Sequence, residues 1–205
     1  PAARPQFVAA VKDPIAAAID GLKWRSIGPA NNAGRIPAIA GVPGDPSTYY
    51  VGGAAGGIAK TTNGGVTFRQ IFDKQSVASI GAIVVAPSDP HIVYVGSGEG
   101  NPRNSASVGD GMYKSVDGGD HWTKIGLEKT DKITRVIVDA KNPDLVWACG
   151  IGRTWGANEE RGVFKTTDGG KSWRKVLYID PQTACSDIAS DPNNSNIMYA
   201  GMYTY

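Results

Sequence analysis

The chain carries the sequence Thr166-Thr167-Asp168-Gly169-Gly170-Lys171-Ser172-Trp173, and two related copies precede it. The copies are Ser115-Val116-Asp117-Gly118-Gly119-Asp120-His121-Trp122 and Thr61-Thr62-Asn63-Gly64-Gly65-Val66-Thr67-Phe68. Each has a hydroxyl residue, an Asp or Asn two positions later, two glycines and then an aromatic residue. An Asp or Asn side chain accepts hydrogen bonds from the amides of a tight turn, and glycine takes the positive φ that the bend requires. The pattern therefore predicts three hairpin turns, with structural roles for Asn63, Asp117 and Asp168.

The aromatic residue of each copy is predicted to open the next strand and to pack on the sheet. These residues are Phe68, Trp122 and Trp173. When the turns are aligned, three further strand-like runs appear in each repeat. The first runs are apolar, and they are Ile36–Gly41, Ile80–Val85, Ile133–Val138 and Cys185–Ala189. The second runs are centred on Tyr50, Tyr94, Trp147 and Tyr199, and the third runs are 57–60, 111–114 and 162–165.

Four short antiparallel strands that repeat at about 50 residues are typical of a β-propeller blade. We predict an all-β fold, an incomplete arc of about three and a half blades from a ring of seven to ten. Residues 1–21 are predicted as a lead-in with one short helix over 13–21. The predicted blades are 33–74, 75–127, 128–180 and, in half, 181–205.

A closing strand is predicted over 22–28, because Trp24-Arg25-Ser26-Ile27-Gly28 matches the fourth strand that starts at Trp122. In a closed ring such an N-terminal strand completes the last blade. The chain is therefore expected to be an N-terminal fragment of a longer protein, whose other blades are its first partners.

The composition and motifs of the chain give no sign of nucleic-acid binding, metal binding, cofactor binding or a membrane span. The 205 residues contain 21 Lys and Arg against 19 Asp and Glu, so a nucleic-acid-binding surface is not indicated. No metal-ligand spacing, cofactor motif or membrane span is present in the sequence, and neither His91 nor His121 has a ligand partner nearby. Cys149 and Cys185 occupy positions in neighbouring blades that could approach each other, and we expect two buried thiols rather than a bond.

Candidate site residues gather where the loops are longest. Antiparallel alternation places the starts of the first strands and the loops between second and third strands on one face. Two of these loops are long, 97–110 and 151–161, whereas 53–56 is short. Long loops on a rigid scaffold usually carry binding and catalysis. The predicted ligand contacts are Arg35, Glu99, Arg103, Asp110, Trp155 and Arg161.

Each candidate also has a structural alternative. Glu99 and Asp110 could form the acid pair of a glycoside hydrolase, at about 5–9.5 Å. Alternatively, they could cap the loop, or they could pair with Arg103 and Arg161. Trp155 could stack on a sugar or cover the channel mouth. Arg35 could bind an anionic ligand or form a structural ion pair.

Several motifs are similar to a known family. The turns resemble the BNR, or Asp-box, repeat. Trp24-Arg25-Ser26-Ile27-Gly28-Pro29, Gly98-Glu99 and Gly109-Asp110-Gly111 resemble the first blades of large bacterial sortilin-like BNR proteins. The resemblance implies an exported β-propeller, periplasmic, secreted or at the cell surface, that binds a protein, peptide or glycan without cofactor or metal. Its alternatives are a BNR-type glycoside hydrolase and an assembly subunit that docks on a larger complex.

Two departures favour binding over hydrolysis. Xyloglucanase-type enzymes place a catalytic Asp in the first-blade loop, where this chain has Ala54 and Ala55. Arg35-Ile36-Pro37 matches part of a sialidase motif, but the other sialidase residues have no counterpart that we can place. The resemblance therefore favours a protein that is not an enzyme.

Overall fold

The structure is a computed structural model, and it describes residues 22, 34–101, 103–192, 194 and 196–204. The predicted helix over 13–21 and, apart from Leu22, the predicted closing strand over 22–28 lie outside the described residues. The description below concerns the compact unit that begins at Gly34.

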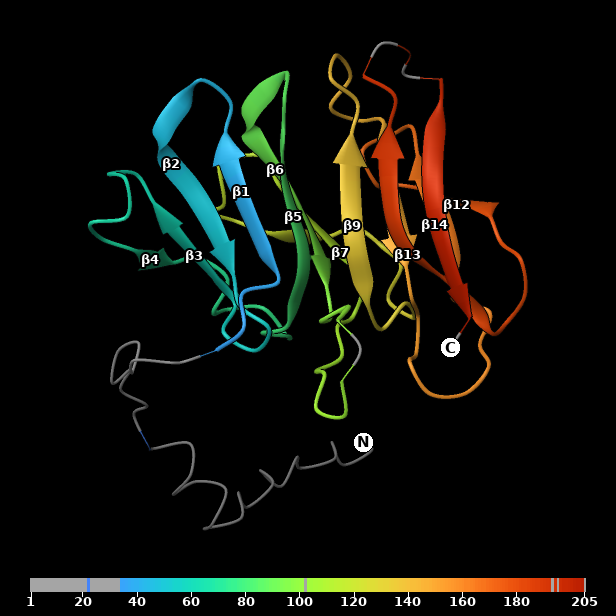
Figure 1. The fold of residues 1–205 in the computed structure, drawn as a ribbon. Helices are drawn as coiled ribbons and strands as arrows, with labels where there is room; N and C mark the ends of the chain where they lie inside the picture. The colour runs from blue at the N-terminus through green and yellow to red at the C-terminus, as the bar shows by residue number, and fades with distance from the viewer. Residues whose placement is uncertain (1–21, 23–33, 102, 193, 195, 205) are drawn as a thin grey trace, which may run out of the picture. The chain divides into compact units, whose positions relative to one another are not determined.

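The described residues form fourteen strands in four antiparallel sheets (Figure 1). The first sheet contains β1 (Ala38–Val42), β2 (Asp45–Gly52), β3 (Ile58–Thr61) and β4 (Arg69–Gln70). The second contains β5 (Ile80–Ala86), β6 (Asp89–Ser97), β7 (Met112–Ser115) and β8 (Thr123–Lys124). The third contains β9 (Ile133–Val138), β10 (Val146–Gly150), β11 (Gly162–Thr166) and β12 (Arg174–Leu177). The fourth pairs β13 (Thr183–Ser190) with β14 (Met198–Thr204).

In each four-stranded sheet the spatial order of the strands follows the chain, as in a propeller blade. The first strands β1, β5, β9 and β13 lie side by side, so successive sheets are neighbours (Figure 1). The described part of the chain is thus all-β and forms an incomplete β-propeller arc, which confirms the predicted fold class. The blade boundaries stay a prediction.

The three Gly-Gly turns are built alike. In the second, the Ser115 hydroxyl donates to Asp117 Oδ1 at 2.7 Å, and Oδ1 accepts the His121 amide at 2.9 Å. The Gly119 amide donates to Ser115 Oγ at 2.8 Å. All six turn glycines have positive φ, between 68° and 96°, and they are Gly64, Gly65, Gly118, Gly119, Gly169 and Gly170. The carboxylate is occupied by its own turn, which is the structural role that the sequence predicts for this position.

The tryptophan after the second turn and the tryptophan after the third turn each tie their blade to the preceding one. Trp122 Nε1 donates to the Ile71 carbonyl at 2.9 Å, and Trp173 Nε1 donates to the Ile125 carbonyl at 2.6 Å. Phe68, in the first blade, instead meets the edge of Tyr49 with ring centroids 5.9 Å apart. The two tryptophans therefore act between blades as well as within their own sheet.

Three hydrophobic clusters fill the spaces between successive sheets. Tyr50 and Ile58 of the first sheet pack with Ile80 and Val93 of the second. Corresponding clusters join the second sheet to the third and the third to the fourth. Since burial of apolar area is the main stabilising term, at about 25 cal/mol per Å², each blade depends on its neighbour for its core.

The expectation of two buried thiols is wrong, because Cys149 and Cys185 form a disulfide with Cα atoms 5.3 Å apart. The blade repeat explains the bond. A Cβ on Gly52 would lie 2.7 Å from Ile80 Cγ2, so the glycine at the end of that second strand leaves room for an isoleucine of the next blade. In the third and fourth blades, Cys149 replaces the glycine and Cys185 replaces the isoleucine. The bond thus takes the place of an interblade packing contact.

Backbone hydrogen bonds sort the loops onto two faces. Amides of the Gly-Gly turns donate to carbonyls at or just before the start of second strands, as Gly118 does to the His91 carbonyl in β6. At the other end of the strands, the loops after second strands bond to the starts of first strands. Examples are Ala54 to the Arg35 carbonyl, Gly98 to Ser79 and Ile151 to Lys132. We call this second end the loop face, and it carries the candidate site residues.

Candidate functional site

Arg35 and Glu99 form a two-pronged ion pair between the first two blades of the loop face. Arg35 Nε donates to Glu99 Oε1 at 2.5 Å, and Arg35 Nη2 donates to Oε2 at 2.6 Å. The Glu99 side chain is fully buried, whereas the Arg35 side chain is 38% exposed. The hydrogen bonds from Arg35 hold the pKa of Glu99 below its ordinary value, although burial opposes this shift. Glu99 is therefore a charged structural group with one partly accessible partner.

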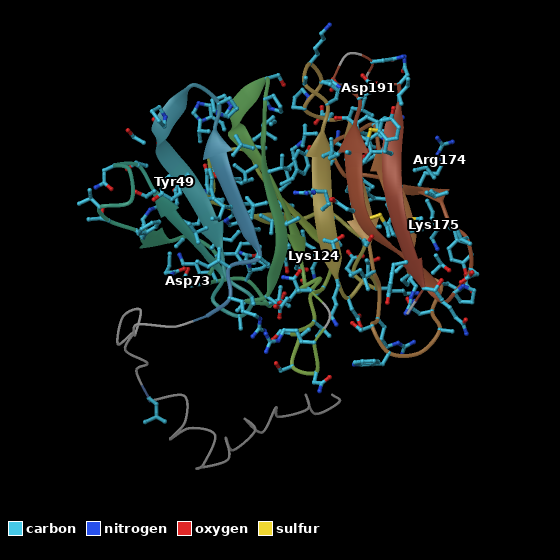
Figure 2. All side chains as sticks on the ribbon, viewed as in Figure 1. Tyr49, Asp73, Lys124, Arg174, Lys175 and Asp191 are labelled. Atoms are coloured by element: carbon cyan, nitrogen blue, oxygen red, sulfur yellow. A yellow bond between two sulfur atoms is a disulfide. The ribbon has the colours of Figure 1, made fainter. Side chains whose placement is uncertain are left out.

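Asp110 is held by a different set of side chains. Its carboxylate accepts the Ser76 hydroxyl at 2.6 Å and the Tyr113 hydroxyl at 2.8 Å, and it pairs with Lys124 Nζ at 2.5 Å. Figure 2 labels Lys124 among the described side chains. Partial burial would raise the pKa of Asp110, but the hydrogen bonds from Lys124, Ser76 and Tyr113 lower it overall. Both candidate carboxylates are thus stabilised in the ionised form.

The alternative prediction that Glu99 and Asp110 pair with Arg103 and Arg161 is wrong. Glu99 pairs with Arg35 and Asp110 with Lys124, and Arg103 acts on Glu99 only through its charge. Arg103 is exposed. The structural ion pair expected as an alternative for Arg35 is present. Lys124, Ser76 and Tyr113 were not predicted as site residues, because the repeat pattern contains no signal for their contacts with Asp110.

Arg161 is buried beneath the loop between β10 and β11, with only 1% of its surface exposed. Its guanidinium donates to the carbonyls of Arg153 at 2.8 Å and Gly156 at 3.2 Å, and also to the carbonyl of Gln182. An arginine has five N–H donors in a planar fork, so one side chain can bind several carbonyls at once. Arg161 therefore shapes the loop and does not offer its guanidinium to a ligand in this structure.

Trp155 projects from the same loop, and 69% of its surface is exposed. The indole is thus accessible, and both roles given above for Trp155 stay predictions. Lys132, which the sequence analysis did not single out, lies buried below the loop and donates from Nζ to the Thr154 hydroxyl. Burial lowers the pKa of Lys132.

A hollow of about 460 Å³ lies where the first strands begin. Its lining includes Pro37, Gly81, Thr134 and the ion pair of Arg135 and Asp187, whose Nε and Oδ1 are 2.8 Å apart. None of the six predicted ligand contacts lines it. The candidate residues are therefore of two kinds: exposed side chains on the loops of the loop face, and buried side chains that hold those loops.

The described residues contain no set of three or more His, Cys, Asp or Glu side chains placed to hold a metal ion. Within the same residues, no helix has the length and apolar character needed to cross a membrane.

The fold and the loop face define a protein of the β-propeller class. The chain belongs to the Sortilin-Vps10 family (sortilin, neurotensin receptor 3), whose sequence model matches residues 56–200. The sortilin-like resemblance expected from the sequence is thereby confirmed. A comparison with curated proteins gave no match.

Solved structures with the same fold include enzymes and a peptide-binding protein. The chain is similar to an ancestral GH74 enzyme, with 23% identity, a TM-score of 0.63, and coverage of 83% of this chain and 22% of that one. The GH74 xyloglucanase from Xanthomonas campestris has 20% identity, a TM-score of 0.56 and coverage of 77% and 26%. YCF48 bound to D1 peptide has 14% identity, a TM-score of 0.54 and coverage of 79% and 46%. The chain spans less than half the length of each, and at these identities the likeness shows the fold alone.

Proposed function

We propose that this propeller arc is a non-catalytic binding module that holds a protein, peptide or glycan ligand on its loop face. The observation that carries the proposal is the state of the two candidate acids. Glu99 is buried in a two-pronged pair with Arg35, and Asp110 is occupied by Lys124, Ser76 and Tyr113. Both carboxylates therefore form structural ion pairs within the loop face.

A glycoside hydrolase of the usual kind needs one carboxyl group that stays protonated at the working pH, which requires a raised pKa. The pKa values of Glu99 and Asp110 are both lowered, and for the same reason: each carboxylate accepts hydrogen bonds from a cation. This argues for retention of a ligand without turnover. The hydrolase alternative keeps the support of a fold shared with GH74 enzymes.

In this proposal the ligand meets the accessible side chains Arg35, Arg103 and Trp155, while Asp110 stays in its pair with Lys124. Glu99 and Arg161 act indirectly, since their burial leaves them to fix Arg35 and the loop of Trp155. An assembly role is the third candidate.

Two further properties belong to the proposal. The three Gly-Gly turns are assigned as Asp-box turns of BNR repeats on the strength of their shared hydrogen bonds. Export from the cell is supported by the Cys149–Cys185 disulfide, since such bonds persist in oxidising compartments.

To test this, the immobilised chain is incubated with a mixture of oligosaccharides and, separately, with a peptide library. The retained ligand and any released reaction products are both measured. We expect retention with unchanged ligand. Turnover that is lost in Glu99→Gln and in Asp110→Asn, with both variants melting as the parent does, would replace binding with hydrolysis. Co-purification with a complex at fixed stoichiometry, with no retained ligand, would favour the assembly role.

A further inference from the structure

We propose that the loop between β10 and β11 is a preformed carbohydrate platform, in which Trp155 stacks on a sugar ring and Arg161 is the positioning residue. This inference rests on the proposed binding function and names its ligand class, a glycan. Three features of the loop carry it: an accessible indole, a fixed backbone and polar surroundings.

The indole of Trp155 differs from those of Trp122, Trp147 and Trp173. Trp122 and Trp173 donate to interblade carbonyls and are half-buried, and Trp147 is buried with Lys165 Nζ 5.0 Å from its ring centroid. Trp155 leaves 69% of its surface in solvent. Single exposed apolar residues are common, so exposure alone does not define a site. The support beneath Trp155 supplies the second observation.

The backbone carbonyls on both sides of Trp155 accept hydrogen bonds from buried or half-buried side chains of the same loop. Arg161 donates to the carbonyls of Arg153, Thr154 and Gly156, and the Asn158 amide nitrogen donates to those of Arg153 and Gly156. The Asn158 backbone amide also donates to the Pro181 carbonyl at 2.9 Å, which ties the loop to the segment before β13.

Two glycines complete the support. Gly152 and Gly156 have φ of 67° and 81°, and a Cβ on Gly152 would lie 2.3 Å from Asn158 Oδ1. The loop is therefore built around Arg161 and Asn158, and its shape is set before a ligand arrives. Ordering a flexible loop on binding costs conformational entropy, and a loop that is already fixed avoids much of that cost.

The surroundings of the indole favour a sugar over an apolar peptide. Arg153 and Glu159 are exposed on the loop, whereas Ile151, its other large apolar residue, is 1% exposed. Protein hot spots are often Trp or Arg as well, but they cluster in well-packed, fully desolvated pockets, whereas 69% of the Trp155 surface is exposed. A sugar ring needs one aromatic face, whose negative quadrupole attracts the C–H groups, and charged neighbours that bind its hydroxyls. Trp155 shares its loop with the exposed side chains of Arg153 and Glu159, of which Glu159 also accepts a hydrogen bond from Tyr178.

The experiment titrates the chain with three soluble hexasaccharides, of β-1,4-glucose, β-1,4-N-acetylglucosamine and α-1,4-glucose, by calorimetry and tryptophan fluorescence. We expect at least one to bind, Trp155→Ala to weaken it at least tenfold, and Trp155→Phe to weaken it less. Trp122→Phe is the matched control and should leave affinity unchanged. Arg161→Met should weaken binding at least threefold and increase acrylamide quenching of Trp155 emission, measured as the difference from Trp155→Phe.

Asn158→Ala is the milder variant and should give both effects in smaller measure, so the positioning role stays testable if Arg161→Met does not fold. Sugar binding that is unchanged in Trp155→Ala would overturn the platform. Unchanged quenching and affinity in the folded Asn158 and Arg161 variants would overturn the positioning role. If all three sugars fail while a library peptide is retained, the glycan inference falls and the binding function stands. If nothing is retained, both fall.

Discussion

The disulfide between Cys149 and Cys185 provides the sharpest stability prediction. The perturbation is reduction: the chain is unfolded in urea with a thiol-free phosphine, refolded with the reductant present, and compared with the oxidised chain. The two cysteines lie 36 residues apart and join the third blade to the fourth. The chain-entropy relation gives about 3 kcal/mol for a 15-residue loop and about 4.7 for 100 residues, so this loop should contribute about 4 kcal/mol.

The assay is urea unfolding followed by tryptophan emission. At about 2–4 °C per kcal/mol for a chain of this size, we also expect the melting temperature to fall by roughly 10 °C on reduction. The double variant Cys149→Ala, Cys185→Ala is the control, and reductant should not change its midpoint. An equal slope in oxidised and reduced samples would show that the transitions can be compared.

Equal midpoints in the oxidised and reduced parent would refute the reasoning, because the bond would then not restrain the unfolded chain. Full alkylation of both cysteines in the unfolded, unreduced protein would refute the bond itself.

Three further outcomes are expected. Arg35→Met should lower the midpoint of urea unfolding, because it leaves the buried Glu99 carboxylate without its partner, whereas the surface control Arg103→Met should change the midpoint little. Trp122→Phe should lower the free energy of unfolding by about 1–2 kcal/mol, because the hydrogen bond to the Ile71 carbonyl is lost. An equal loss in Phe68→Leu would argue against an interblade role for Trp122. Hydrogen bonds from His121 and Ser115 lower the pKa of Asp117 in the folded chain, so the ionised carboxylate stabilises the fold fully above its unfolded pKa of about 3.9, and this stabilisation is lost as pH falls through the lower folded pKa. Asp117→Asn, which copies Asn63, should therefore lose less folding stability between about pH 5 and 2 than the parent chain does. An unchanged dependence of stability on pH in this range would contradict the prediction.

The repeat pattern predicted the sheets because each strand's role is encoded locally. A turn such as Ser115–Trp122 contains its own hydrogen-bond donors, acceptors and positive-φ glycines, so alignment of three turns places the strands between them. The first strand of the third blade was predicted at 133–138 and observed there. Face assignment followed from strand alternation, without any knowledge of side-chain contacts.

The site was less predictable because its partners are distant in sequence. Glu99 pairs with Arg35 across 64 residues, and nothing near either residue indicates the other. Arg161 was predicted as a ligand contact, yet its position depends on how the loop folds over it, which spacing does not encode. The disulfide could be placed by alignment to neighbouring blades, but the choice between thiols and a bond depended on the distance between them.

The claim that the loop face retains its ligand without turnover depends most on the charge state of its carboxylates. The direct measurement is a carbon-13 NMR titration of Glu99 and Asp110 side-chain carboxyls in the whole chain, assigned with Glu99→Gln and Asp110→Asn. We predict that both titrate below the ordinary values of about 4.3 for Glu and 3.9 for Asp. A carboxyl group at either position that titrates near pH 6, as a general acid does, would contradict the account.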